Sequence, residues 1–157
     1  YDSKITCGVN GYYKELYKKL SAIKATDDYK PYFESAAALA DVLSVKAELG
    51  IKTRAAYLAG DTKALKCIAE NDYTAAIEKL RSFHTKFRKF WFFENKPHGF
   101  DVQDIRLGGL IMRLESCRDR LLEFCDDTAK KIPELSEPVL EDERFRFWEN
   151  IATANVM

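Results

Sequence analysis

The chain is poor in the residues that tight turns require, with only seven glycines and four prolines among 157 residues. An all-β domain with many hairpins needs more of both, and no segment alternates apolar and polar residues over a strand's length. Twenty-five basic and 25 acidic side chains cancel, so no net field would attract nucleic acid or an anionic membrane. No apolar run reaches the ~18 residues of a membrane span, and no secretory signal opens the chain.

Cysteine is also scarce. Cys7, Cys67, Cys117 and Cys125 form no CxxC pair, and neither histidine stands at metal-ligand spacing from them. On one helix, the Cα atoms of Cys117 and Cys125 would lie about 12 Å apart, beyond the reach of a disulfide. We therefore expect reduced thiols, a reducing cytoplasm, and neither a metal nor another cofactor.

Helical periodicity is what the chain has in abundance. Apolar residues recur at three- and four-residue steps, and 46% hydrophobic content is enough for a core. The pattern predicts helices over residues 11–25, from Pro31 to just before Gly60, from Asp61 to about Asn71, over residues 72–94, from Asp101 past Phe124, and around Phe145, Trp148 and Ala152. We predict one all-α domain over residues 1–157, an antiparallel bundle of about five to six helices.

Two of these helices carry specific expectations. The stripe Ala36, Ala40, Leu43, Ala47, Ile51, Ala55, Leu58 keeps its phase through Gly50, which favours one long helix; a break at Gly50 is the alternative. Asp61 is expected to cap the short helix that follows. Asp101 is expected to cap the helix whose apolar stripe includes Ile105, Leu110, Leu114, Cys117, Leu121 and Phe124.

The basic and aromatic stretch of residues 81–96 invites comparison with a nucleic-acid or membrane face. On a helical wheel, however, most of its aromatic residues cluster on one side and its basic residues occupy the remainder, as on an ordinary surface helix. Phe92 and Phe93 are exceptions that point away from the stripe. Large aromatic side chains in such positions are usually covered, which predicts contact with a loop or another domain.

The polar corner of residues 94–101 joins two long helical patterns through Pro97 and Gly99. It can be a simple helix-to-helix turn, because these residues break helices and Asn and Asp cap them. Alternatively, its side chains contact a partner, since loops on rigid scaffolds often carry recognition. The interface candidates are Phe92, Phe93, Glu94, Asn95, Lys96, His98, Asp101 and Arg106.

Two further features are candidate sites by residue type. Gly108 and Gly109 interrupt a helical pattern at a cost of about 2 kcal/mol relative to two alanines, which indicates close approach by a neighbouring element inside or outside the domain. Asp142 and Glu143 are adjacent carboxylates within a charged run typical of an exposed helix start. No catalytic motif occurs, so we predict no catalytic residue in this chain.

Three segments carry a resemblance to a known family. They are ENKPHGFDV and RLGG within residues 91–113, RAAYLAGD at residues 54–61, and FWENIATANV at residues 147–156. The chain resembles the C-terminal helical domain of glycoside hydrolase family 20 enzymes, the β-N-acetylhexosaminidases.

The resemblance implies a larger enzyme. In that family, a TIM barrel removes terminal N-acetylhexosamine residues through an adjacent Asp and Glu and the substrate's own acetamido group. A barrel needs upwards of about 200 residues, which this chain does not contain, so no catalytic residue is transferred. The implied partner is the catalytic domain of the same polypeptide, with homodimerisation open; no nucleic acid and no membrane are expected. Because the chain begins at Tyr1, we interpret it as a piece of a longer polypeptide. The alternative is a free-standing helical interaction module.

Overall fold

The computed structural model describes residues 8–138. The helix expected around Phe145, Trp148 and Ala152 lies outside these residues. Within them every element is helical: α1 Val9–Ser21, α2 Lys30–Lys46, α3 Leu49–Leu58, α4 Thr62–Cys67, the π-helix η2 Ile68–Tyr73, α5 Thr74–Glu94, α6 Phe100–Cys125 and α7 Pro133–Ser136. The prediction of an all-α antiparallel bundle is confirmed.

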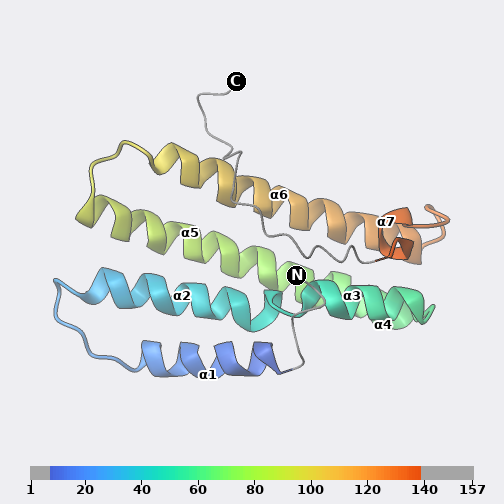
Figure 1. Ribbon diagram of the computed structural model, residues 1–157, viewed down its shortest axis with the longest axis horizontal. Coiled ribbons are helices and arrows are strands. Elements are labelled where there is room, and N and C mark those ends of the chain that lie inside the picture. The colour runs from blue at the N-terminus through green and yellow to red at the C-terminus, as the bar shows by residue number, and fades with distance from the viewer. Residues whose placement is uncertain (1–7, 139–157) are drawn as a thin grey trace.

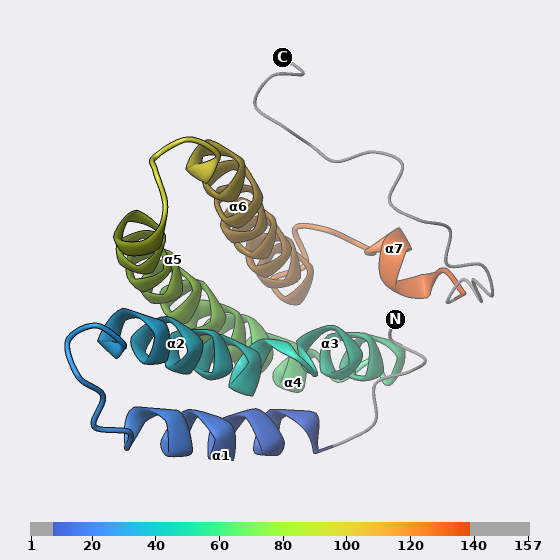
Figure 2. The ribbon, with the colours of Figure 1, turned by 60° about the vertical axis from the view of Figure 1, so that its left-hand side comes forward.

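Helices α1, α2, α5 and α6 lie side by side as an antiparallel layer (Figures 1 and 2). The short elements α3, α4 and α7 gather at one end of this layer. At the other end, the loop between α1 and α2 and the corner between α5 and α6 lie on the same side of the molecule (Figure 1). Two segments about 70 residues apart in sequence therefore share one end of the domain.

The core lies where α5 meets its neighbours. Because α5 packs between α2 and α6, its Ala76, Ile77, Leu80 and Phe83 are buried. Residues from the surrounding elements complete the core: Ala38, Val42, Leu49, Leu65, Ala69, Tyr73, Ile111, Leu114, Leu121 and Ile132. Tyr73 is the polar member, and its hydroxyl lies 3.3 Å from the Thr53 hydroxyl, so the buried phenol has a hydrogen-bond partner.

The expected long helix through Gly50 is wrong, because the chain turns at Ala47 and Glu48. There the Glu48 backbone N–H donates to the side-chain oxygen of Asn10 (3.1 Å), so it does not continue the α2 ladder. In return, the Asn10 backbone N–H donates to the Glu48 carboxylate (3.1 Å), and the Asn10 amide donates to the Val45 carbonyl (3.3 Å). Gly50 lies inside α3, so a break at Gly50 is also misplaced.

The stripe expected on this segment is only partly buried. Ala40 is buried, whereas Ala36 and Leu58 are exposed. The residues of α2 that are buried instead include Ala37, Ala38 and Val42. The reason is that α2 packs between α1 and α5 and therefore buries two of its sides, which a single stripe does not describe.

The expected helix end near Asn71 is also wrong. The backbone stays helical from Thr62 through η2 into α5, with one wider π turn between them. The Asn71 amide donates to the Cys67 carbonyl (3.0 Å), so this side chain bonds within the turn rather than ending the helix. Asp61, by contrast, caps α4 as predicted, because its carboxylate accepts from the Ala64 backbone N–H (2.9 Å).

The contact between Asn10 and Glu48 predicts a pH dependence. The hydrogen bond from the Asn10 backbone N–H, together with the nearby backbone N–H groups of Val9 and Gly8, lowers the pKa of Glu48. A carboxyl whose pKa is depressed by folding stabilises the fold above its unfolded pKa, and this stabilisation is lost as pH falls through the folded pKa. Attachment of α1 should thus weaken in acid, and Glu48→Gln should weaken it at neutral pH. Amide hydrogen exchange of α1 measures both effects. Glu15→Gln, which removes a carboxylate paired only with Lys18 within α1, should leave exchange unchanged.

Candidate functional site

The corner between α5 and α6 is fixed by its own backbone and by Trp91. The Asn95 N–H donates to the Trp91 carbonyl (2.7 Å) at the end of α5, and the Trp91 indole N–H donates to the Lys96 carbonyl (3.1 Å). Gly99 then adopts φ +91°, and a β-carbon at this position would lie 3.6 Å from the Trp91 ring. Only glycine takes this conformation without strain, so the corner has one defined path.

Phe100 anchors the corner to the bundle. It is buried, and its ring centroid lies 5.5 Å from Phe92, 5.7 Å from Trp91 and 5.9 Å from Phe87. Three aromatic rings of α5 thus converge on the first residue of α6. Farther along, His84 on α5 hydrogen-bonds Asp104 on α6 (2.6 Å), so the two helices are tied on both sides of this aromatic cluster.

The eight interface candidates are all exposed. Phe92 is 40% exposed and lies beneath the Arg88 guanidinium, 5.0 Å from its ring centroid. Phe93 is 52% exposed, and no aromatic contact is found for it among the described residues. The side chains of Asn95, Lys96 and His98 likewise form no hydrogen bond within residues 8–138. The corner therefore presents two aromatic rings and several polar groups outward from a rigid support.

Two expectations about α6 are wrong. Gly99, not Asp101, is the N-cap residue; Asp101 lies in the first turn, where its negative charge still favours the helix N-terminus. Ile105 is exposed rather than buried, and Ile111 takes the core position instead, alongside Leu114 and Leu121. The helix begins one residue earlier than Asp101, and its buried side is the one that faces α5.

No packing contact within the described residues requires glycine at positions 108 and 109. A β-carbon built at either glycine would meet no heavy atom within 4 Å. Exposed apolar side chains, Ile105 and Met112, stand on either side of the pair along α6. Within residues 8–138, no neighbouring element therefore makes the close approach that the glycine pair predicts.

Gly109→Ala should stabilise the isolated domain by up to about 1 kcal/mol, because alanine fits the space and favours the helix. Gly99→Ala should do the opposite, since φ +91° strains any side chain. Chemical denaturation of the two variants compares the same substitution at two positions. A loss of stability in Gly109→Ala would mean that something does contact this face.

Two aromatic residues that no sequence pattern singled out approach the corner from α2. Tyr29 and Tyr32 flank Pro31 at the start of that helix and are 62% and 41% exposed. The Tyr32 ring centroid lies 4.6 Å from that of Phe90, and hydrogen bonding to the Glu94 carboxylate raises the pKa of Tyr32. Tyrosines three residues apart at a helix start are a weak signal, because nothing in the sequence indicates that α2 begins beside the end of α5.

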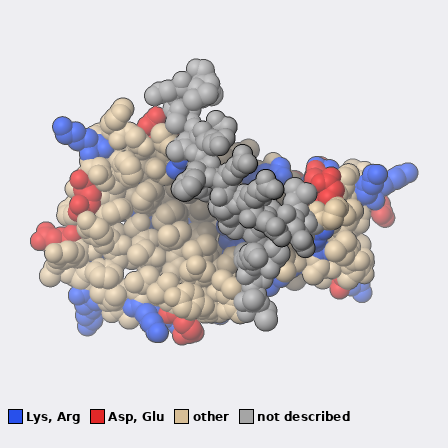
Figure 3. All heavy atoms as spheres, in the orientation of Figure 1, with Lys and Arg blue, Asp and Glu red and all other residues tan. Residues whose placement is uncertain are grey.

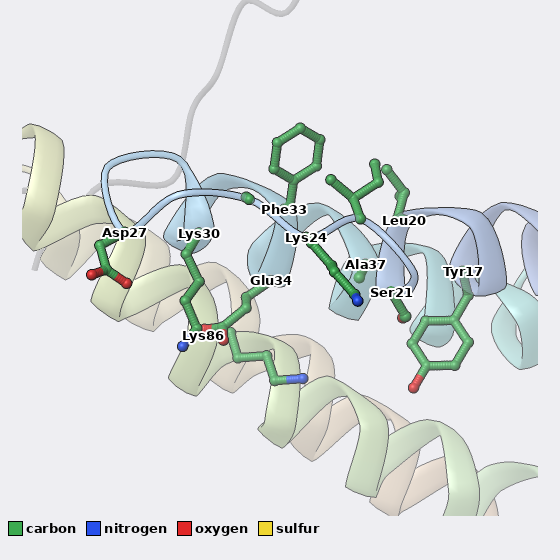
Figure 4. A pocket seen from close by; sticks show the side chains of 12 residues that line it. Tyr17, Leu20, Ser21, Lys24, Asp27, Lys30, Phe33, Glu34, Ala37 and Lys86 are labelled. Atoms are coloured by element: carbon green, nitrogen blue, oxygen red, sulfur yellow. The ribbon is translucent and has the colours of Figure 1, made fainter.

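A groove of about 360 Å³ separates α1 from α5 on one side of α2 (Figure 4). Lys24, Lys30 and Lys86 line it together with Asp27 and Glu34, and Lys24 points into it. Helix α1 has no buried residue, because it packs mainly on α2. In the view of Figure 3, by contrast with this groove, the surface over α2 and α5 is largely uncharged. The charged side chains lie mainly at the margins of that view.

Metal sites, disulfides and membrane spans are the other features that residues 8–138 could carry. No group of three or more His, Cys, Asp or Glu side chains there could hold a metal ion. Cys67, Cys117 and Cys125 are free thiols in this part of the chain; Cys7 lies outside it. None of the helices in the same residues has a stretch of sufficient length and apolarity to cross a bilayer.

The fold places this chain among small antiparallel helical domains, here with one end rich in exposed aromatic side chains. It matches the Glycoside Hydrolase 20C C-terminal domain over residues 1–151 and belongs to that family. The resemblance carried by the three sequence segments is thus confirmed. We found no match among curated proteins.

Proposed function

We propose that this chain is a non-catalytic C-terminal domain that packs on the catalytic domain of a β-N-acetylhexosaminidase-like, exo-acting glycoside hydrolase. The observation that carries the proposal is the family match over residues 1–151. A C-terminal domain of a hydrolase has the catalytic domain as a neighbour in the same polypeptide. Its contribution is then structural: it covers and orients part of the enzyme.

The contact surface we propose is the corner with the two phenylalanines before it. Phe92 and Phe93 are exposed at the end of α5, and Glu94, Asn95, Lys96, His98, Asp101 and Arg106 surround them with polar groups. Interfaces draw most of their affinity from a few aromatic and arginine anchors within a polar rim. The rigid path of the corner lowers the entropy cost of presenting these side chains.

Catalysis is assigned to the catalytic domain alone. The purified 157-residue chain should not hydrolyse a chromogenic N-acetylglucosaminide, whereas the intact enzyme should. Asp142 and Glu143 lie outside the described residues. Substitutions at these two positions are the control for any activity of the isolated chain. Turnover by the isolated chain that Asp142→Asn or Glu143→Gln abolishes would place the chemistry in this domain and refute the proposal.

The second candidate function is a free-standing interaction module, or a domain that supports homodimerisation, through the same corner. The same exposed aromatic rings favour it, since they would serve any protein partner. Sedimentation of the intact enzyme over a range of concentrations separates the cases. A constant monomer mass supports packing on its own catalytic domain, and a mass that doubles with concentration supports a dimer. The free thiols of residues 8–138 are compatible with a reducing cytoplasm as the compartment.

A further inference from the structure

We infer that the surface that packs on the catalytic domain extends beyond the corner to the start of α2, where Tyr29 and Tyr32 form its second half. This inference rests on the proposed function and adds residues and a shape to it. It concerns the end of the bundle at which the loop between α1 and α2 meets the corner between α5 and α6 (Figure 1).

Exposed apolar side chains concentrate at this end. Ten large hydrophobic side chains are exposed among the described residues, and half of them belong to the segments that meet here: Ile23, Tyr29, Tyr32, Phe92 and Phe93. Most surface hydrophobic residues of a soluble domain are scattered singly. A cluster assembled from two loops and two helix ends is the pattern of a contact surface instead.

The two halves are physically joined. Tyr29 and Tyr32 lie 6.4 Å apart between ring centroids, Tyr32 lies 4.6 Å from Phe90, and Phe90 is on the helix that carries Phe92 and Phe93. The Tyr32 hydroxyl is also close enough to the Glu94 carboxylate, at the last residue of α5, for that carboxylate to raise the pKa of Tyr32. Glu94 is therefore shared between the corner and the tyrosine pair.

The chemistry fits a protein partner. Tyrosine offers a large apolar ring and a hydroxyl, and only two side-chain torsions are fixed on binding. The hydroxyl of Tyr29 has no hydrogen-bond partner among the described residues, so it remains available to a partner. Phe93 provides apolar area on α5, and the lysines of the adjoining loops form a solvated rim.

The occupant we assign is the catalytic domain rather than a second copy of the chain. The family places that domain in the same polypeptide. Tethering provides an effective concentration of roughly millimolar, so a modest aromatic patch is enough to hold the contact. A second copy has to associate from solution and would need a larger area for the same occupancy.

Hydroxyl-radical footprinting of the intact enzyme tests the inference, because the chain supplies a matched pair of tyrosines. Tyr12 on α1 is 65% exposed and Tyr29 is 62% exposed, so an uncovered domain would oxidise both at similar rates. We expect Tyr29, Tyr32 and Phe93 to react more slowly than Tyr12 in the intact enzyme. We further expect Tyr29 to become as reactive as Tyr12 once the catalytic domain has been cut away after folding.

The outcomes separate this inference from the proposed function. Slow oxidation of Phe92 and Phe93 with Tyr29 as reactive as Tyr12 overturns the inference and leaves the corner as the contact. Both are overturned if Tyr29 reacts as fast as Tyr12 and if Phe92 and Phe93 react no more slowly in the intact enzyme than after removal of the catalytic domain. If Tyr29 stays protected after removal of the catalytic domain, this chain itself covers the residue. If the protection appears only at high enzyme concentration, a second copy covers it. Either result overturns the inference.

A binding measurement provides the second arm. In an enzyme cut between its domains after folding, Tyr29→Ala combined with Tyr32→Ala should weaken the association of the two pieces about tenfold or more. Tyr12→Ala makes the same chemical change at an equally exposed site and should leave association unchanged. An unchanged dissociation constant in the double variant would overturn the inference even if footprinting showed protection. Tyr32→Phe then reports the share of the association that depends on the Tyr32 hydroxyl.

Discussion

Phe100→Ala should destabilise the domain by about 3–5 kcal/mol, the usual cost of truncating a buried phenylalanine. Its ring is surrounded by Trp91, Phe92 and Phe87, so alanine would leave a cavity at the junction of α5 and α6. The surrounding aromatic rings are large and held by two helices, which limits how far they can relax into the space. Equilibrium denaturation of the isolated domain, followed by far-ultraviolet circular dichroism, measures this loss.

The control for this prediction is Leu58→Ala, which shortens an exposed side chain at the end of α3. It should change the free energy of unfolding by less than about 0.5 kcal/mol, as is usual for surface substitutions. A loss in Phe100→Ala that is no larger than this would contradict the role of Phe100 as the anchor. The corner would then not be a rigid support for the residues around it.

Local chemistry made part of the fold predictable. Asp61 was recognised as a cap because an aspartate before an apolar helical pattern has few other roles there, and it does accept the Ala64 N–H. Pro31 was expected at a helix start and lies in the first turn of α2. The end of α5 at Glu94 follows from Pro97 and Gly99, which interrupt any helix. In each case a residue acts on backbone within a few positions of itself.

The errors arose where distant residues decide the local structure. No residue near Glu48 in the sequence predicts the helix break, because its backbone N–H donates to the side chain of Asn10, 38 residues away. The π turn at residues 68–73 was interpreted as an end and a new start, since Asn71 is a poor helix former in sequence. The stripe through Ala36 failed because α2 has two neighbours. Periodicity identifies a helix but not how many partners it has.

The candidate site divides in the same way. The exposure of Phe92 and Phe93 was predictable, because both lie off the apolar stripe of one helix and no tertiary information is needed to see this. The approach of Tyr32 to Phe90 was not, since it depends on how α2 and α5 lie in register. Whether these exposed rings contact a catalytic domain remains a prediction, which the following experiment tests.

Phe93→Ala should weaken the docking of this domain on its catalytic domain by about 2 kcal/mol, roughly thirtyfold in the dissociation constant. The reason is that Phe93 is 52% exposed and has no aromatic contact in the described residues, so its exposed apolar area contributes little to the stability of the domain. Burying that area against a partner would be worth about as much as burying any large apolar side chain. The dissociation constant is measured on an enzyme cut between its domains after folding.

The same substitution should leave the isolated domain nearly unchanged, and this contrast is what makes the prediction specific. Because Phe93 is outside the core, its loss should alter the free energy of unfolding by less than about 0.5 kcal/mol. Arg106→Ala is the companion variant, since Arg106 is exposed on the first turns of α6 and can reach the same partner. If it lowers the stability of the isolated domain instead, Arg106 holds the corner together from within. If Phe93→Ala costs stability but not affinity, the ring serves the fold, and the corner is only a turn between two helices.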